Sequence, residues 1–167
     1  MIIIGYPCIG KSTLAKNPFS KEFKYRVIDL ESSYFKPGGK NHEGWVDNYC
    51  AMAKELSDNG HIVFVSSHKD VVDKLYNSVS VFELCLIYPG LPLKDAWVQK
   101  AKDRWNKTQL SKDLHSYERI MNHYEEDIGA LMRRSNFNPY HIIIKDINYD
   151  LEELIKGWIN RQERFRE

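Results

Sequence analysis

The chain has 167 residues, which suits one compact domain and is too short for two ordinary ones. Its hydrophobic fraction of 43% and charged fraction of 28% are those of a globular protein, and its net charge of +1 lacks the basic excess of a dedicated nucleic-acid binder. The three cysteines have no CxxC spacing, and no apolar run reaches the ~18 residues of a membrane span. A cytoplasmic protein with no membrane partner is therefore expected, and a nucleic-acid partner is not favoured.

The chain begins with an apolar run at residues 2–4 that leads directly into the sequence GYPCIGKS. This stretch matches G-x-x-x-x-G-K-S/T at every fixed position. Glycines let the backbone curl so that successive N–H groups face phosphate oxygens, while the lysine reaches the β and γ phosphates and the serine hydroxyl binds Mg²⁺. ATP with Mg²⁺ is thus the predicted ligand, at the start of a short helix over residues 11–16. The predicted ATP-binding residues are Gly5, Tyr6, Pro7, Cys8, Ile9, Gly10, Lys11, Ser12 and Thr13.

Four more β-rich apolar runs follow along the chain. They cover residues 25–30, 61–66, 82–88 and 140–145. Apolar residues at helical spacing predict helices over residues 45–57, 69–76 and 151–161, and two further helices, about 94–107 and 116–134, fill the interval between the fourth and fifth strands. Strands that alternate with helices predict an α/β protein with a parallel sheet. The long insertion, about residues 91–138, predicts a lid.

With these features the chain resembles the P-loop kinases of the nucleoside monophosphate kinase and shikimate kinase-like group, in their small bacteriophage-type form. The resemblance covers nearly the whole chain. It implies a single three-layer P-loop NTPase domain over residues 1–167, with a five-stranded parallel sheet of order 2-3-1-4-5 and helices on both faces. It also implies transfer of the γ-phosphoryl group of ATP to a small acceptor, in the first place a nucleoside or deoxynucleoside monophosphate. A kinase for polynucleotide 5′-hydroxyls or for another small hydroxyl is the alternative, and a non-catalytic nucleotide-binding switch is the alternative of another class.

Two acidic residues, Asp29 and Glu31, follow the second predicted strand. Side chains two apart on a strand share a face, and the carboxyl ends of parallel strands are where open α/β sheets bind ligands. In the kinases that the chain resembles, an acidic residue here binds Mg²⁺ or accepts the proton of the acceptor. Asp29 is therefore expected to serve as magnesium ligand or base and Glu31 as an acceptor contact. Capping of the next turn is the alternative for both.

Three aromatic residues, Tyr34, Phe35 and Trp45, come next in the chain. They are expected to stack on the base of the acceptor, or alternatively to pack the helix over residues 45–57 onto the sheet. The third strand ends at Ser66-Ser67-His68 without the acidic residue of ABC and AAA-type ATPases, which leaves Asp29 as the better magnesium candidate. His68 is expected at the start of a helix, and a contact of Ser66, Ser67 or His68 with the substrate or the γ-phosphate is the alternative.

The first lid helix carries Lys100, Arg104 and Lys107 on one side. Arginine matches phosphate oxygens with its planar fork, so Arg104 is the first candidate to clamp the transferring phosphate and Lys100 is the second. An ordinary solvated face is the alternative.

Other candidates lie nearer the end of the chain. Arg133 and Arg134 are expected to compensate a helix dipole or to reach the phosphates. In the resembling kinases, the segment after the last strand holds the adenine, which makes Asn148 a candidate, with helix capping as its alternative. The scattered histidines predict no structural metal.

Overall fold

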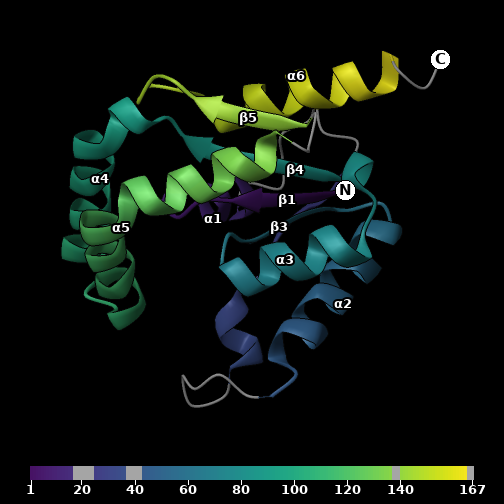
Figure 1. Cartoon of the computed structure of the whole chain (residues 1–167), viewed down its shortest axis with the longest axis horizontal. Helices are drawn as coiled ribbons and strands as arrows, with labels where there is room; N and C mark the ends of the chain where they lie inside the picture. Colours follow the sequence, from purple (N-terminus) through teal and green to yellow (C-terminus); the bar gives the residue numbers. More distant parts are fainter. Residues whose placement is uncertain (17–24, 37–42, 137–139, 165–167) are drawn as a thin grey trace.

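The computed structural model describes residues 1–16, 25–36, 43–136 and 140–164, and Figure 1 shows their arrangement. Five strands form one parallel sheet with the order β2-β3-β1-β4-β5. The strands are β1 (Ile2–Gly5), β2 (Val27–Asp29), β3 (Ile62–Ser66), β4 (Leu84–Pro89) and β5 (His141–Ile144). The predicted α/β class, parallel sheet and strand order are confirmed.

Six α-helices surround the sheet in the described residues. They are α1 (Lys11–Lys16), α2 (Trp45–Asp58), α3 (Lys69–Ser78), α4 (Lys94–Thr108), α5 (Ser111–Ser135) and α6 (Leu151–Arg164). In Figure 1, α3 and α5 pass in front of the sheet and α1 lies behind it. From β1 to β2 the chain moves toward one edge of the sheet, and from β2 through β5 it moves toward the other edge. Because crossovers between parallel strands are right-handed, this reversal places α1 on one face and α3 and α5 on the other.

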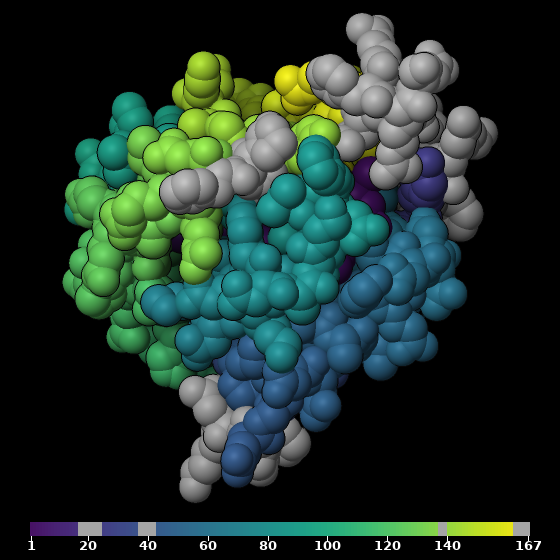
Figure 2. All heavy atoms as spheres, turned by 45° about the vertical axis from the view of Figure 1, so that its right-hand side comes forward, coloured from purple at the N-terminus to yellow at the C-terminus, as the bar shows by residue number. Residues whose placement is uncertain are grey.

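The three central strands are buried along almost their whole length. Ile2, Ile3 and Ile4 are at most 1% exposed, and every residue of β4 is buried. Strands covered on both faces need apolar side chains on both, which explains the continuous apolar runs of the sequence. In Figure 2, β1 is almost hidden behind the blue and teal atoms that include α2 and α3.

The register of the sheet brings several strand ends to one edge. Gly5, the last residue of β1, is paired with Ser66 of β3 and Ile87 of β4. On the far side of β3, Asp29 is paired with Phe64. The loop after β1 therefore leaves the sheet between two other strand ends, with Asp29 two strands away.

The structure corrects several predicted boundaries. Strand β2 covers only three residues, and Phe82 lies in a 3-10 helix, η3 (Val81–Glu83), that precedes β4. In α2 the buried face contains Tyr49, Cys50 and Ala53, whereas the apolar residue Met52 is 39% exposed.

The second lid helix begins at Ser111 instead of at residue 116. Its first turn lacks an apolar stripe and depends on polar contacts of Asp113, which sequence periodicity does not reveal.

Helices α4 and α5 form a hairpin at the left of Figure 1, on the side where the strands end. Gln109 joins them with a left-handed backbone, φ 53°, that reverses the chain direction sharply. At His123 the backbone leaves helical geometry, with φ −130°, so α5 is kinked. None of the helices in the described ranges is long and apolar enough to span a bilayer.

Candidate functional site

The loop between β1 and α1, residues 6–10, has a tightly curled backbone. Cys8 and Gly10 both adopt left-handed conformations, with φ of 66° and 100°. Residues in alternating right- and left-handed conformations turn successive N–H groups toward one side and create a concave anion-binding nest. Gly5 permits a close approach at the base of the loop, because a Cβ there would lie 2.6 Å from Ile9 Cδ1 and 2.9 Å from Lys11 Cδ.

Side chains from distant elements hold this loop by its carbonyl groups. Trp97 Nε1 of α4 donates to the Pro7 carbonyl at 2.9 Å, and Tyr149 Oη donates to the Ile9 carbonyl at 2.8 Å. Lys11 Nζ donates to the Gly5 carbonyl at 2.7 Å. These three contacts all use carbonyl oxygens of the loop and so do not occupy its N–H groups. The Tyr6 N–H is bonded to the Ile87 carbonyl of β4 at 3.0 Å, which ties the start of the loop to the sheet.

Lys11 lies beneath the loop and is partly exposed. Burial lowers the pKa of its ammonium group, and the nearby carboxylates of Asp29 and Glu31 partly oppose this effect. A partly desolvated cation gains from an anionic ligand, because the ligand restores electrostatic stabilisation that water no longer fully provides. The position is well suited to a phosphate group.

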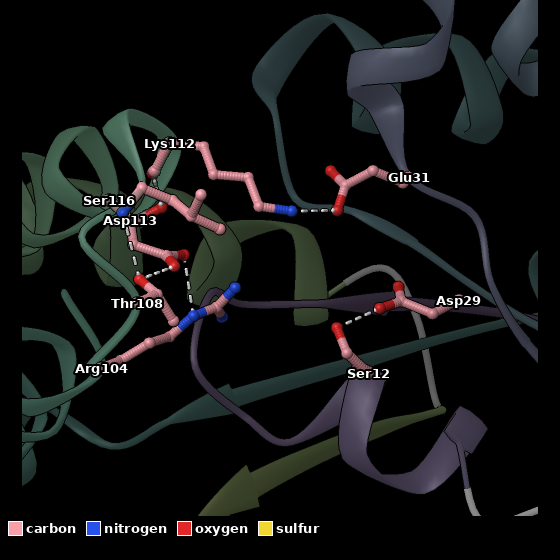
Figure 3. Close-up of polar contacts among 9 residues, drawn as sticks. Ser12, Asp29, Glu31, Arg104, Thr108, Lys112, Asp113 and Ser116 are labelled. Atoms are coloured by element: carbon pink, nitrogen blue, oxygen red, sulfur yellow. Dashed lines mark hydrogen bonds and ion pairs between the residues drawn. The ribbon is translucent and has the colours of Figure 1, made fainter.

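Ser12 and Asp29 meet at the edge of the sheet. The Ser12 hydroxyl donates to Asp29 Oδ2 at 2.5 Å, as drawn in Figure 3. A hydroxyl beside a carboxylate is an oxygen pair of the kind that binds Mg²⁺, which usually keeps several waters and takes only one or two protein ligands besides phosphate oxygens. Among the described residues no group of three or more His, Cys, Asp or Glu side chains is arranged to hold a metal. Ser12 and Asp29 are therefore the residues that could hold Mg²⁺.

Arg104 reaches the same region from α4. Its Nε forms an ion pair with Asp113 Oδ1 at 2.8 Å, and Figure 3 shows the guanidinium between Asp113 and the Ser12–Asp29 pair. Burial raises the pKa of the Cys8 thiol, and the Arg104 guanidinium is the main group that opposes the rise. Arg104 thus lies close to the curled loop, where it could contact a bound phosphate group.

Lys100 lies on the same helix but has a different environment. Its Nζ is 4.7 Å from the ring centre of Trp97 and 4.8 Å from that of Tyr149, and it donates to Tyr149 Oη at 3.0 Å. Both aromatic partners are the residues that anchor the loop carbonyls. Lys100 therefore packs against the two aromatic residues that hold the loop, on the α4 side of the site.

The residues predicted on the acceptor side are arranged in two ways. Glu31 Oε2 accepts a hydrogen bond from Lys112 Nζ of α5 at 3.0 Å and forms an ion pair with it, so Glu31 faces the α4–α5 hairpin (Figure 3). Tyr34, in the 3-10 helix η1 (Ser32–Phe35), is 82% exposed and its ring is free to stack.

Phe35 and Trp45 have the packing arrangement that was the alternative to stacking. Phe35 lies edge-on to Tyr49 with ring centres 5.2 Å apart. Trp45 is 5% exposed and belongs to the core, with the His68 ring 5.6 Å away and Lys36 Nζ 3.8 Å from its centre. His68 itself precedes the first residue of α3, as predicted for a helix start.

Local contacts decide part of two predictions for the end of the chain. Asn148 is exposed and does not cap α6; Asp150 does, because its Oδ1 accepts from the N–H groups of Glu152 and Glu153, at 2.9 and 3.2 Å. Arg134 forms an ion pair with Asp73 and lies 5.3 Å from the Tyr76 ring centre. It therefore docks α5 against α3 and does not point to the phosphate loop.

Several residues of the site were not predicted from the sequence. Trp97 is one of them: an apolar residue on the predicted helix over residues 94–107, it holds the loop with its ring N–H. Thr108, Lys112 and Asp113 lie at the α4–α5 junction, where the sequence has neither a motif nor an apolar period. The only sequence indication was an acidic residue near the start of a helix, which is common and carries no functional information.

No protein-family model matches the chain, and a search of curated proteins finds no significant relative. The function has to be inferred from the site itself.

Replacing Gly5 with alanine is expected to weaken ATP binding by about tenfold or more while the protein stays folded. The new Cβ would meet Ile9 and Lys11, so the loop has to open. Titration calorimetry with ATP and Mg²⁺ measures the effect. Gly157→Ala is the matched control, because a Cβ at this exposed position of α6 meets nothing within 4 Å and only improves helix propensity. Equal ATP affinity in Gly5→Ala and Gly157→Ala would contradict the assignment of the loop.

Proposed function

We propose that the protein is a P-loop kinase that transfers the γ-phosphoryl group of ATP, with Mg²⁺, to a small acceptor, in the first place a nucleoside monophosphate. One observation carries the proposal. The curled loop, Lys11, the Ser12–Asp29 pair and Arg104 converge at one edge of a parallel sheet. Phosphoryl transfer requires little more than positioning and neutralisation of charge, and these groups supply both.

Each residue has a defined role in this proposal. The N–H groups of the loop and the Lys11 ammonium bind the β and γ phosphates, and Ser12 with Asp29 holds the metal. Mg²⁺, when bound, neutralises charge on the β- and γ-oxygens. The terminal nitrogens of Arg104 stabilise the charge on the transferring group. In the reaction the bond from the γ phosphorus to the β–γ bridging oxygen breaks, and a bond to an acceptor oxygen forms.

The Ser12–Asp29 contact favours a metal role for Asp29 over a base role. A carboxylate that already shares a site with the magnesium-binding hydroxyl is well placed as a ligand. A nucleoside monophosphate also needs no base, because its phosphate, with a second pKa of ~6, is largely deprotonated at neutral pH. The acceptor oxygen is then already anionic, whereas a hydroxyl acceptor would have to lose its proton to a carboxylate.

The acceptor side has its own charged pair. Glu31, which follows β2, forms an ion pair with Lys112 of α5, and their side chains are 34% and 49% exposed. Both side chains are therefore accessible to a ligand. A carboxylate can accept hydrogen bonds from sugar hydroxyls or base amines, and an ammonium group can bind the acceptor phosphate.

Incubation with ATP labelled at the γ-phosphate tests the proposal. The protein is given mononucleotides, nucleosides and oligonucleotides with a 5′-hydroxyl, and the labelled product is identified. We expect the label on a mononucleotide. Label on the oligonucleotide or the nucleoside would establish one of the alternative acceptors, and tight ATP binding without any labelled acceptor would favour a nucleotide-binding switch.

Replacing Glu31 with glutamine is expected to raise the KM for the acceptor by about fivefold or more, with the KM for ATP within about twofold. The substitution removes the charge that pairs with Lys112 and faces the acceptor. Steady-state kinetics with each substrate varied in turn provide the measurement. Glu55→Gln, at an exposed position on α2, is the control. An unchanged acceptor KM in Glu31→Gln would leave Glu31 as a structural partner of Lys112 only.

A further inference from the structure

Asp113 is the only buried charged side chain in the described residues, with 2% exposure. Burial of a carboxylate is unfavourable unless ion pairs and hydrogen bonds replace its lost hydration. Asp113 also lies in the first turn of α5, away from the central sheet, where an exposed polar residue would suffice for folding. Its burial therefore needs a specific explanation.

Both oxygens of the Asp113 carboxylate have protein partners. Oδ1 pairs with Arg104 Nε at 2.8 Å, and Oδ2 accepts from the Thr108 hydroxyl at 2.6 Å (Figure 3). The Thr108 oxygen in turn accepts from the Leu110 N–H at 3.4 Å. The left-handed turn at Gln109 brings the end of α4 and the start of α5 together for these contacts. The carboxylate is thus fixed from both sides.

The way in which Arg104 is held leaves part of its guanidinium group available. Arginine has five N–H donors, of which the Nε donor faces Asp113. Within the described residues Arg104 has no other ion-pair partner, and Figure 3 shows its terminal nitrogens on the side of Ser12 and Asp29. The terminal nitrogens, which also lie within reach of the Cys8 thiol, therefore point toward the place proposed for the transferring phosphate.

We infer that Asp113 is a positioning residue, which orients Arg104 over the phosphate loop before any ligand binds. The inference rests on the proposed function. A free arginine side chain has to lose the freedom of several rotatable bonds before it can contact a transferring group, and this loss of conformational entropy is unfavourable. Asp113 fixes the side chain at its Nε and leaves the phosphate-binding fork free. The role predicts a loss in the rate of transfer, since Arg104 acts on the transition state, with little change in ATP affinity.

A double-mutant cycle tests the inference. Asp113→Asn keeps the shape of the side chain and removes its charge; we expect kcat to fall by about 10- to 50-fold, with the KM for ATP within about twofold. Arg104→Ala is expected to lower kcat by about 100-fold, and the double variant to be no slower than Arg104→Ala alone. Asp127→Asn is the matched control, because Asp127 also lies on α5 and pairs with an arginine, Arg119, through two hydrogen bonds of 2.9 and 2.5 Å.

The cycle separates positioning from a structural role. If Asp113→Asn lowered kcat by the same factor in the Arg104→Ala background, Asp113 would act independently of Arg104 and the inference would be wrong. Thr108→Val provides a second variant should Asp113→Asn fail to fold, because it removes one hydrogen bond to the carboxylate. We expect a smaller fall, of about two- to fivefold, which also disappears without Arg104.

A measurement without substrate distinguishes this inference from the proposed function. The Nε–H signal of Arg104 in a nitrogen–proton NMR spectrum, assigned by its loss in Arg104→Lys, should exchange slowly with water in the parent protein and rapidly in Asp113→Asn. Slow exchange in a protein that transfers no phosphate would refute the proposed function while retaining the fixed arginine. Rapid exchange in the parent would refute the inference whatever the activity.

Discussion

Replacing Lys11 with alanine is expected to abolish phosphoryl transfer, with a loss on the order of 1,000-fold or more. The Lys11 ammonium lies beneath the curled loop, hydrogen-bonded to the Gly5 carbonyl, where no other lysine replaces it in the described residues. The thermal midpoint should stay the same or rise, because burial already lowers the lysine pKa and so makes its charge costly in the free protein. Rate assays and calorimetric unfolding together measure both effects.

Lys16→Ala is the control for this prediction. It removes an equal charge from an exposed position in the last turn of α1 and should leave the rate within about twofold of the parent. A Lys11→Ala protein that retained the parent rate would show that the loop does not bind the reacting phosphates. Loss of transfer together with a large fall in the thermal midpoint would instead assign Lys11 to folding.

Replacing Asp29 with asparagine is expected to lower kcat by about 100-fold or more and to raise the Mg²⁺ concentration needed for half-maximal rate. The amide oxygen can still accept the Ser12 hydroxyl, so the substitution mainly removes the negative charge that would hold the metal. The rate is measured over a range of Mg²⁺ concentrations at fixed ATP. Partial recovery at high Mg²⁺ is the specific indication of a metal ligand.

Asp58→Asn is the corresponding control, because Asp58 pairs with Lys54 at the exposed end of α2. It should change neither kcat nor the Mg²⁺ dependence. An unchanged rate in Asp29→Asn would return Asp29 to its alternative role of capping the turn after β2. A lower rate with an unchanged Mg²⁺ dependence would favour the base role.

The sheet and the curled loop after β1 could be predicted from the sequence because both depend on local patterns. The central strands are continuous apolar runs, as burial on both faces requires. The loop needs glycine where the backbone makes a close approach at Gly5 and where it turns left-handed at Gly10. The positions of these glycines in the sequence therefore indicate the turn. The right-handed crossover rule then leaves few arrangements of five strands.

The supports of the site could not be predicted in the same way. Trp97 and Tyr149 hold the loop from 90 and 140 residues away, and no local pattern distinguishes such a residue from one that only packs. Arg104 was a candidate because of its charge and its place on a predicted helix. Its partner Asp113 depends on the sharp turn at Gln109 and on the early start of α5, and the turn requires an uncommon positive φ in a residue other than glycine.

The most direct test of the central claim is a crystal structure with Mg²⁺ and a non-hydrolysable ATP analogue. The proposal predicts the β and γ phosphates within hydrogen-bond distance of the N–H groups of residues 8–13 and of Lys11 Nζ, with the metal at Ser12. An analogue bound elsewhere, or a loop that stays free of ligand at saturating concentration, would contradict it.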